Sequence, residues 1–332
     1  MGWLKSYLTN RQQIVKIDDI NSDIITLNCG VPQGSILGPL LFSIYTNDLY
    51  VALKHCKLIQ FADDSTIYMT GHPVNTTHLI NQDLETLMVW FAVNRLSLSD
   101  NKNSVIIFKN SEIQPCNLTI QINNHMPQIE THVKLLGIHL DSNLSWTTHL
   151  HHLRQKLSSA NYALSRCKNF LNTPALKLIY YGLFHSHLTY GISLWGGSTC
   201  TNIRPLTILQ KKAIRHIYHR SYREHTDPLF SYGNIMKIDD IHKIECIKIA
   251  FRLLNHKLPV NLQIFFQLNA NVHQHNTRQT LVPHFNHMSS TKFKTSFIYH
   301  TATCWAGIPE VIRNNPNWNV VKNWSKSRLL SQ

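Results

Sequence analysis

Leu58-Ile59-Gln60-Phe61-Ala62-Asp63-Asp64-Ser65-Thr66-Ile67-Tyr68-Met69 is the run from which the architecture of this 332-residue chain can be inferred. Two adjacent carboxylates, Asp63 and Asp64, lie between two short apolar stretches that contain β-branched and aromatic residues. Such stretches favour strands, and a short polar segment between them favours a tight turn. The pattern therefore predicts a β-hairpin over residues 57–70 with both aspartates at its tip.

Two neighbouring carboxylates on a rigid turn repel each other, and a divalent cation that binds both of them removes this repulsion. Mg²⁺ takes carboxylate oxygens together with substrate phosphates as ligands, and phosphoryl transfer by paired metal ions needs such carboxylates. In most proteins, however, an acidic turn is only a solvated turn. The interpretation as a metal site therefore depends on the residues that precede and follow the hairpin.

A loop shaped by glycine and proline precedes Asp63 by about 25 residues. Its sequence is Gly30-Val31-Pro32-Gln33-Gly34-Ser35-Ile36-Leu37-Gly38-Pro39, and an apolar run follows it. Glycine allows a backbone to approach a ligand closely, and the Gln33 amide could contact a base or sugar edge. The segment predicts a loop at 30–35 that leads into a buried helix from about 36 to 50. Taken alone, such a loop would be assigned a structural role.

Together, the loop and the hairpin resemble the palm of a reverse transcriptase. The similarity is to the non-LTR retrotransposon family (LINE-like, jockey/RTE-type), whose members are RNA-directed DNA polymerases of mobile elements. Further segments that resemble this family lie at 3–13, 94–108, 134–141, 209–215, 228–230, 276–278 and 305–309. The resemblance implies a polymerase palm, an antiparallel sheet with packed helices, followed by an α-helical thumb and a C-terminal helical region.

The resemblance also implies roles for individual residues. Asp63 would be the main metal ligand, with Asp64 beside it, and Mg²⁺ or Mn²⁺ would be the cofactor. Lys102 falls on a lysine proposed to act on the pyrophosphate leaving group, but Asn103 and Ser104 depart from the residues that usually follow it. The implied primer grip is Leu136 and Gly137, and the implied contacts with template and nucleotide are Pro32, Gln33, Gly34, Phe61 and Ala62. The partners would be an RNA template, a DNA primer and dNTPs.

One part of the family pattern is missing from this sequence. The family's first palm motif, which carries another metal-binding aspartate, lies ahead of the segment that residues 3–13 resemble. Asp18, Asp19 and Asp23 lie among isoleucines in a strand–turn–strand pattern, and we do not expect them to replace that ligand. The two-metal mechanism needs carboxylates from both elements. We therefore expect an N-terminally truncated polymerase, without fingers, that has little or no activity alone.

The positive charge of the chain is concentrated in its second half. Residues 1–150 contain 9 Lys/Arg and 12 Asp/Glu, whereas residues 151–332 contain 23 Lys/Arg and 6 Asp/Glu. A basic half attracts nucleic-acid phosphates through the release of counterions. A generally basic surface without a specific partner stays the alternative, because the Lys and Arg residues are scattered along the sequence.

Two other functional classes stay open. A non-catalytic, basic nucleic-acid-binding remnant of the polymerase would bind RNA or DNA in a salt-dependent way without extending a primer. Another palm polymerase, such as a group II intron or viral RNA-copying enzyme, would share the acidic hairpin. The segments that resemble the thumb and C-terminal regions of non-LTR elements argue against this last class.

Cysteine and histidine patterns predict neither a zinc ribbon nor a redox motif. The seven cysteines form no CxxC pair, and their odd number and wide spacing suit reduced thiols of an intracellular protein, nuclear or cytoplasmic and not secreted. No stretch of 18 apolar residues predicts a membrane span. His149, His151 and His152 cluster at the start of an expected helix, where ordinary histidines are favoured over a metal site.

The order of apolar and polar residues predicts an α+β fold that becomes helical after residue 146. Helices are expected at 3–9, 36–50, 75–94, 203–218 and 239–254, and strands near 13–18, 24–29, 57–70, 104–109, 118–123 and 132–140. Two more helices are expected from apolar stripes, one at Leu150, Leu153, Leu157, Tyr162 and Leu164 and one at Leu178, Tyr181, Leu183 and Leu188. The predicted domains are a partial palm at 1–145, a helical thumb at 146–225 and a C-terminal helical region at 226–332.

Overall fold

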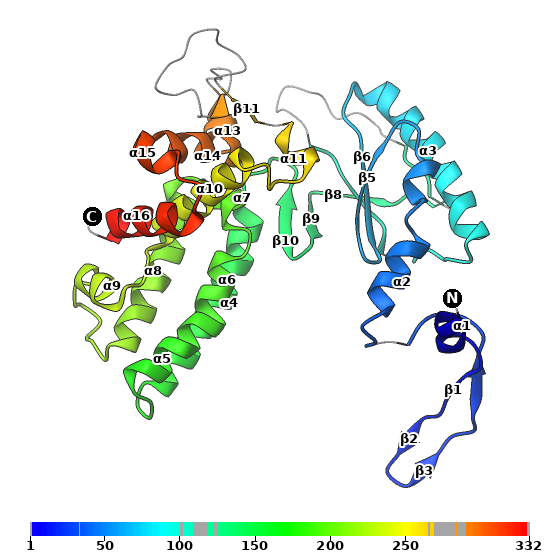
Figure 1. Ribbon diagram of the computed structural model, residues 1–332, viewed down its shortest axis with the longest axis horizontal. Helices are drawn as coiled ribbons and strands as arrows, with labels where there is room; N and C mark the ends of the chain where they lie inside the picture. The colour runs from blue at the N-terminus through cyan, green and yellow to red at the C-terminus, as the bar shows by residue number, and fades with distance from the viewer. Residues whose placement is uncertain are drawn as a thin grey trace. The chain divides into compact units, whose positions relative to one another are not determined.

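The structure is a computed structural model, and it describes residues 2–32, 34–99, 102–108, 119–122, 125–264, 266–268, 283–284 and 290–330. The chain divides into two compact units (Figure 1). The first unit comprises residues 1–105 and 110–130, and the second comprises residues 106–109 and 131–332. Gln33, residues 276–278 and part of the strand expected at 118–123 lie outside the described residues.

Up to residue 130 the chain alternates short strands with helices (Figure 1). The strands are β1 (Arg11–Gln13), β2 (Lys16–Ile17), β3 (Ile20–Asn21), β4 (Ile25–Leu27), β5 (Lys57–Phe61), β6 (Asp64–Tyr68), β7 (Ser104–Ile106) and β8 (Gln128–Glu130). The helices are α1 (Gly2–Leu8), α2 (Gly38–Tyr45), the 3₁₀ helix η1 (Leu49–Ala52) and α3 (Pro73–Val93). Antiparallel ladders join β1 to β4, β2 to β3 and β5 to β6.

The expected mixture of helices and antiparallel strands is confirmed, with two local differences. Within the described residues the strands form separate two-stranded ladders and not one continuous sheet. The helix expected at 36–50 is wrong beyond Tyr45, because the backbone of Thr46 leaves the helical conformation. The Thr46 hydroxyl donates to the Phe42 carbonyl at 3.1 Å, and the 3₁₀ turn η1 follows.

Helix α3 and the β5–β6 hairpin share one hydrophobic core. Leu49, Leu84 and Leu87 are buried, and Leu58 of β5 and Ile67 of β6 pack against them. The helix expected at 75–94 is therefore confirmed as α3, with Leu84 and Leu87 on its buried side. This packing fixes the hairpin through the side chains on its inner face.

A buried carboxylate also joins α3 to the segment that enters β5. Asp83 is only 1% exposed. Its two oxygens accept hydrogen bonds from the backbone N–H groups of Lys54 at 3.0 Å, His55 at 2.8 Å and Cys56 at 2.6 Å. Three successive N–H donors on one carboxylate satisfy both the buried charge and the backbone of this segment. Asp83 therefore anchors the start of the hairpin.

From residue 131 onward the chain is mostly helical (Figure 1). The strands are β9 (His132–Leu135), β10 (Ile138–Asp141), β11 (Gln267–Leu268) and β12 (Pro283–His284). The longer helices are α4 (Thr147–Cys167), α8 (Cys200–Ile217), α10 (Ile238–Leu254), α14 (Phe297–Ala306) and α16 (Trp318–Leu330). The shorter ones are α5 (Thr173–Ile179), the π-helix η3 (Tyr180–His185), α6 (Ser186–Thr189), α7 (Ile192–Trp195), α9 (Asp227–Gly233), α11 (Val260–Gln263), α13 (Thr291–Lys294) and α15 (Glu310–Arg313).

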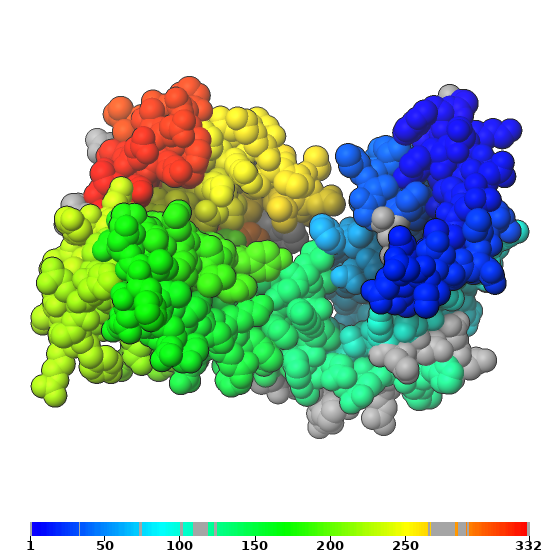
Figure 2. Space-filling model, turned by 90° about the horizontal axis from the view of Figure 1, so that it is seen from below, coloured from blue at the N-terminus to red at the C-terminus, as the bar shows by residue number. Residues whose placement is uncertain are grey.

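Two buried clusters hold the second unit together. The larger one is built mainly by α4, α8 and the helical stretch from α5 to α7, with Trp195 completely buried. The smaller one joins α10, α14 and α16 around Phe251, Trp305 and Val321. Figure 2 shows the C-terminal residues (red) lying against the yellow segment that contains α10. Within the described ranges, no helix has the length and apolar character needed to cross a membrane.

The helices expected at 203–218 and 239–254 are confirmed as α8 and α10, and the expected stripe on α4 is confirmed apart from one position. Leu150, Leu153, Leu157 and Leu164 are buried, but Tyr162 is exposed. Because an α-helix repeats every 3.6 residues, position 162 lies off the stripe, and Asn161 takes the inward place.

The stripe expected on the next helix is wrong except for Leu188. Leu178, Tyr181 and Leu183 are exposed, whereas the buried residues are Leu176, Tyr180, Phe184 and Leu188. These four recur at intervals of four, which would drift around a regular α-helix. The wider turn of the π-helix at Tyr180–His185 keeps them on one face.

Candidate functional site

The acidic hairpin has the predicted geometry at its tip. Five residue pairs join β5 to β6, and the last pair is Phe61 with Asp64. The connecting turn therefore consists of Ala62 and Asp63, while Asp64 begins β6. Ala62 has a φ of 52°, in the left-handed region that two-residue hairpin turns use and that alanine seldom adopts. The prediction of a strand–turn–strand motif is confirmed, with one aspartate in the turn and one directly after it.

Both aspartates face solvent. In the part of the chain that the structure describes, neither carboxylate forms an ion pair, and no group of three or more Asp, Glu, His or Cys side chains forms a metal cluster. One or two carboxylates, completed by water and substrate phosphates, are the donor set that Mg²⁺ takes in phosphoryl-transfer sites. Asp63 and Asp64 fit that donor set.

Gln60 connects the acidic turn with the end of α2, a contact that the sequence analysis missed. Its Nε2 donates to the Thr46 hydroxyl at 2.8 Å and to the Ala62 carbonyl at 3.5 Å. Thr46 is 3% exposed, so this polar pair lies at the edge of the core. Alternation along β5 could have revealed it, because residue 60 shares the inner face with Leu58.

The Gly/Pro loop depends on backbone conformations that favour glycine. Gly30 and Gly34 both have a φ of +77°, and no atom would crowd a Cβ at either position. The requirement is therefore conformational and not steric. Another residue outside the predicted set, Arg11, fixes the start of the loop by donating to the carbonyls of Cys29 at 2.8 Å and Gly30 at 2.5 Å.

The residues after Gly30 turn directly into α2. The Ser35 N–H donates to the Pro32 carbonyl at 3.3 Å, and the Ser35 hydroxyl accepts a hydrogen bond from the Gly38 N–H at 3.0 Å. Pro39 then occupies the first turn of α2, where its missing N–H is not needed. Pro32 and Gly34 thus belong to one compact loop.

Lys102 lies apart from the acidic turn in its contacts. It is exposed and lines a hollow of about 300 Å³ with Gln128 and Glu130. Among the described residues, no ion pair joins Lys102 to Asp63 or Asp64. Its role toward a leaving group therefore stays a prediction from the resemblance.

The hairpin expected to grip a primer lies in the second unit. Leu135 pairs with Ile138, so Leu136 and Gly137 form a two-residue turn between β9 and β10. Both have positive φ, 46° and 83°, as type I′ hairpin turns require. The acidic turn belongs to the first unit, so the expected site residues are divided between the two units.

The histidine cluster packs β10 onto α4. The His139 and His152 rings stack with centroids 4.1 Å apart, and the His139 N–H donates to Nδ1 of His149 at 3.4 Å. Burial lowers the pKa of His149 to about 4, with a further contribution from the neighbouring His139. His149 is therefore neutral near pH 7 and serves as a packing residue beside Trp195.

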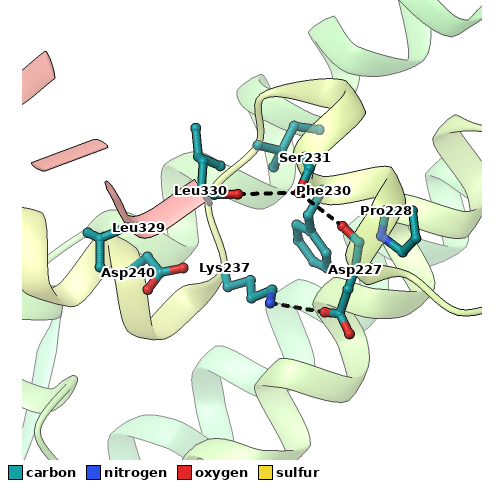
Figure 3. Close-up of a pocket in the computed structure, with 9 residues that line it drawn as sticks. Asp227, Pro228, Phe230, Ser231, Lys237, Asp240, Leu329 and Leu330 are labelled. Atoms are coloured by element: carbon teal, nitrogen blue, oxygen red, sulfur yellow. Dashed lines mark hydrogen bonds and ion pairs between the residues drawn. The ribbon is translucent and has the colours of Figure 1, made fainter. Parts of the chain in front are cut away.

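Figure 3 shows a pocket of about 250 Å³ in the second unit, between α9, the start of α10 and the end of α16. Its polar groups pair with groups of the protein. Lys237 and Asp227 form an ion pair at 3.0 Å, and the Ser231 hydroxyl donates to the Leu330 carbonyl at 3.4 Å. The Lys237 ammonium holds the pKa of Asp227 below its ordinary value. The pocket is therefore a junction between helices and is not assigned to the site.

Comparisons with known proteins agree with the resemblance found in the sequence. Residues 1–140 match the family model described as reverse transcriptase (RNA-dependent DNA polymerase). The chain is 28% identical over 258 residues to a probable RNA-directed DNA polymerase from transposon BS of Drosophila melanogaster, covering 74% of the chain and 28% of the relative. It is 26% identical over 265 residues to the RNA-directed DNA polymerase from mobile element jockey of Drosophila funebris, covering 76% and 29%.

A third relative is the retrovirus-related Pol polyprotein from the type-1 retrotransposable element R1 of Bradysia coprophila, 28% identical over 203 residues. This match covers 58% of the chain and 19% of the relative. The chain thus spans less than a third of the length of each of these three relatives. No solved structure matches the chain significantly. Residues 1–140 therefore match the reverse transcriptase family model, and most of the chain is similar to RNA-directed DNA polymerases from mobile elements.

Proposed function

We propose that this chain carries the metal-binding hairpin of an RNA-directed DNA polymerase from a mobile element. The intact enzyme would copy an RNA template by adding deoxynucleotides to a DNA primer. The β5–β6 turn is the observation that carries the proposal, because it presents two solvent-facing carboxylates from a rigid strand pair. Asp63 would be the main ligand of Mg²⁺ or Mn²⁺, and Asp64 the second.

When bound at this turn, the ion would stabilise the negative charge that develops on the reacting phosphate. Other residues of the chain hold the turn in place. Ala62 and Asp63 form the turn, Gln60 ties the Ala62 carbonyl to Thr46, and Asp83 anchors the start of β5. These contacts hold the carboxylates without using their oxygens.

We expect little or no primer extension from the chain alone. The two-metal mechanism uses carboxylates from more than one element, and Asp63 and Asp64 come from a single turn. A primer-extension assay with the purified chain, an RNA template, a DNA primer, dNTPs and Mg²⁺ should therefore give background signal. Robust extension that Asp63→Ala abolishes would contradict this expectation of inactivity.

Metal binding tests the hairpin independently of activity. Mn²⁺ titrated into the full chain and followed by electron paramagnetic resonance should bind, and the double variant Asp63→Asn/Asp64→Asn should lose that binding. The chain offers a matched control, because Asp18 and Asp19 also form a two-residue turn, between β2 and β3. The variant Asp18→Asn/Asp19→Asn should keep Mn²⁺ binding. Equal losses in both variants would overturn the proposed site.

A cationic aromatic site favours the second candidate function, a non-catalytic nucleic-acid-binding remnant. Tyr222, between α8 and α9, is 74% exposed. Lys212 Nζ and Arg215 Cζ lie 6.0 Å and 5.9 Å from the centre of its ring. An exposed ring flanked by cations is suited to stacking with an unpaired base while phosphates pair with the cations.

Binding of labelled single-stranded RNA, measured by fluorescence anisotropy, separates this function from catalysis. Tyr222→Ala should weaken binding about fivefold or more, because stacking of one base contributes ~1–3 kcal/mol. Tyr232→Ala is the control, since Tyr232 lies on α9 of the same unit and is 81% exposed. Binding without extension would favour the remnant, and equal affinities for both variants would remove Tyr222 from the interface.

A further inference from the structure

The turn of the β9–β10 hairpin contains a residue that rarely adopts its conformation. Leu136 has a φ of 46°, in the left-handed region where a leucine side chain crowds its own backbone. Type I′ turns favour Asn, Asp or Gly at this position. Leucine at such a site is expected only where other contacts hold it there.

One side chain from a distant part of the second unit makes those contacts. The Tyr190 hydroxyl donates to the Leu136 carbonyl at 2.5 Å. The same ring covers Gly137, since its Cε1 would lie 3.5 Å from a Cβ built at that glycine. Tyr190 therefore contacts both residues of the turn, one by a hydrogen bond and one by packing.

The backbone of Tyr190 is itself held by a residue of the core. The Nε1 of Trp195, a completely buried residue, donates to the Tyr190 carbonyl at 3.0 Å. Gly191 follows with a φ of 63°, and a Cβ at this position would lie only 2.7 Å from Cδ1 of Ile138. The corner between α6 and α7 thus fits closely against β10, and glycine suits both the positive φ and this approach.

We infer that Tyr190 is a positioning residue that holds the Leu136-Gly137 turn in one conformation for contact with a primer terminus. The primer contact rests on the proposed function, but the hold on the turn does not. Tyr190 is 54% exposed, so packing in the core does not by itself explain the position of its ring. Its hydroxyl reaches the turn from an element that the core of the second unit keeps in place.

Tyr190→Phe tests the hold, because it removes the hydroxyl and keeps the ring. Amide hydrogen exchange across residues 134–139 should become about fivefold faster, the factor that corresponds to an average hydrogen bond. Tyr162→Phe is the matched control, since Tyr162 is 68% exposed on α4 and lies off the buried stripe. Exchange at 134–139 that is unchanged in Tyr190→Phe, or equally faster in both variants, would overturn the inference.

A second measurement reads the primer end. A primer–template duplex with 2-aminopurine at the primer 3′ end, bound to the full chain, should give a different fluorescence with Tyr190→Phe than with the unaltered chain, at a similar Kd. If Tyr190 has only a structural role, the 2-aminopurine fluorescence of the bound duplex should be the same for Tyr190→Phe and for the unaltered chain. If the unaltered chain leaves the fluorescence as in free duplex, the primer-grip function fails, whereas the exchange result still decides whether Tyr190 holds the turn.

Discussion

At the scale of single residues, Asp83 shows how a buried charge can organise the surroundings of a functional turn. Burial alone would raise the pKa of its carboxyl. Hydrogen bonds from the backbone N–H groups of Cys56, Lys54 and His55 outweigh burial, so the pKa lies below its ordinary value. The carboxylate in turn contributes to the raised pKa of the Cys56 thiol, about 12, for which burial is the larger cause.

Asp83→Asn should lower the free energy of unfolding of the first unit by about 2 kcal/mol at pH 7, since hydrogen bonds to charged groups contribute ~1.5–3 kcal/mol. Because the folded-state pKa is depressed, this contribution is present above the ordinary aspartate pKa of 3.8 and is lost as pH falls through the lower folded value. The difference between the two proteins should therefore shrink below about pH 4.

Urea unfolding at pH 7 and at pH 3, combined with amide exchange at residues 54–56, measures this difference. Asp48→Asn serves as the control, because Asp48 is an exposed carboxylate just ahead of η1. A difference between Asp83→Asn and the unaltered chain that is constant with pH would show that the carboxylate charge does not stabilise the segment.

At the scale of elements, the strands around the acidic turn could be predicted and the irregular helix could not. Two short apolar stretches with β-branched and aromatic residues, separated by a polar tip, identify β5 and β6. Alternation along β5 indicates that Gln60 faces inward, but the contacts of Gln60 and Asp83 were missed because a polar residue at an inward position becomes meaningful only when its partner is known. Their partners are backbone groups and Thr46, which leave no mark in the local pattern.

The stripe of buried residues predicted for the helix after Asn172 is wrong for a different reason. Its buried residues follow intervals of four, and a stripe drawn for a regular helix selects the exposed side instead. A π-helix is defined by its i→i+5 backbone hydrogen bonds, and no residue type in the sequence specifies it. The tip at Leu136 is similar, because leucine by itself argues against the left-handed conformation that Tyr190 secures.

Two glycines of the second unit test this description of its helices. Gly182 lies in the π-helix, and nothing would contact a Cβ there. Gly182→Ala should stabilise the second unit by about 0.5–1 kcal/mol, because alanine loses less backbone entropy than glycine. Gly196→Ala should destabilise it, since a Cβ would lie 2.5 Å from the Ile192 carbonyl oxygen and 2.6 Å from Cδ2 of His242.

Thermal unfolding followed by circular dichroism compares the two variants. A higher Tm for Gly182→Ala together with a lower Tm for Gly196→Ala is the expected pair of results. A lower Tm for Gly182→Ala would show that the wide turn needs glycine, and the space observed around it would then not explain the residue.

At the scale of the whole molecule, charge separates the two halves of the sequence more sharply than their folds do. Residues 1–150 carry three more acidic than basic residues, whereas residues 151–332 carry seventeen more basic than acidic ones. The acidic turn that would hold a cation lies in the first half, and the cations that would meet phosphates lie in the second. The proposed division of labour, metal binding before residue 150 and nucleic-acid binding after it, follows from this distribution.

The salt dependence of nucleic-acid binding tests that division quantitatively. Each phosphate contact contributes about −0.9 to the slope of log K against log salt concentration for duplex DNA and about −0.7 for single strands. Lys212→Ala/Arg215→Ala should therefore make the slope for single-stranded RNA shallower by about 1.4. Lys16→Ala/Lys57→Ala removes the same charge from exposed positions of the first unit and should leave the slope nearly unchanged. The slopes are measured by fluorescence anisotropy between about 50 and 200 mM salt. Equal effects of the two double variants would mean that net charge alone, and not a surface of the second unit, attracts the nucleic acid.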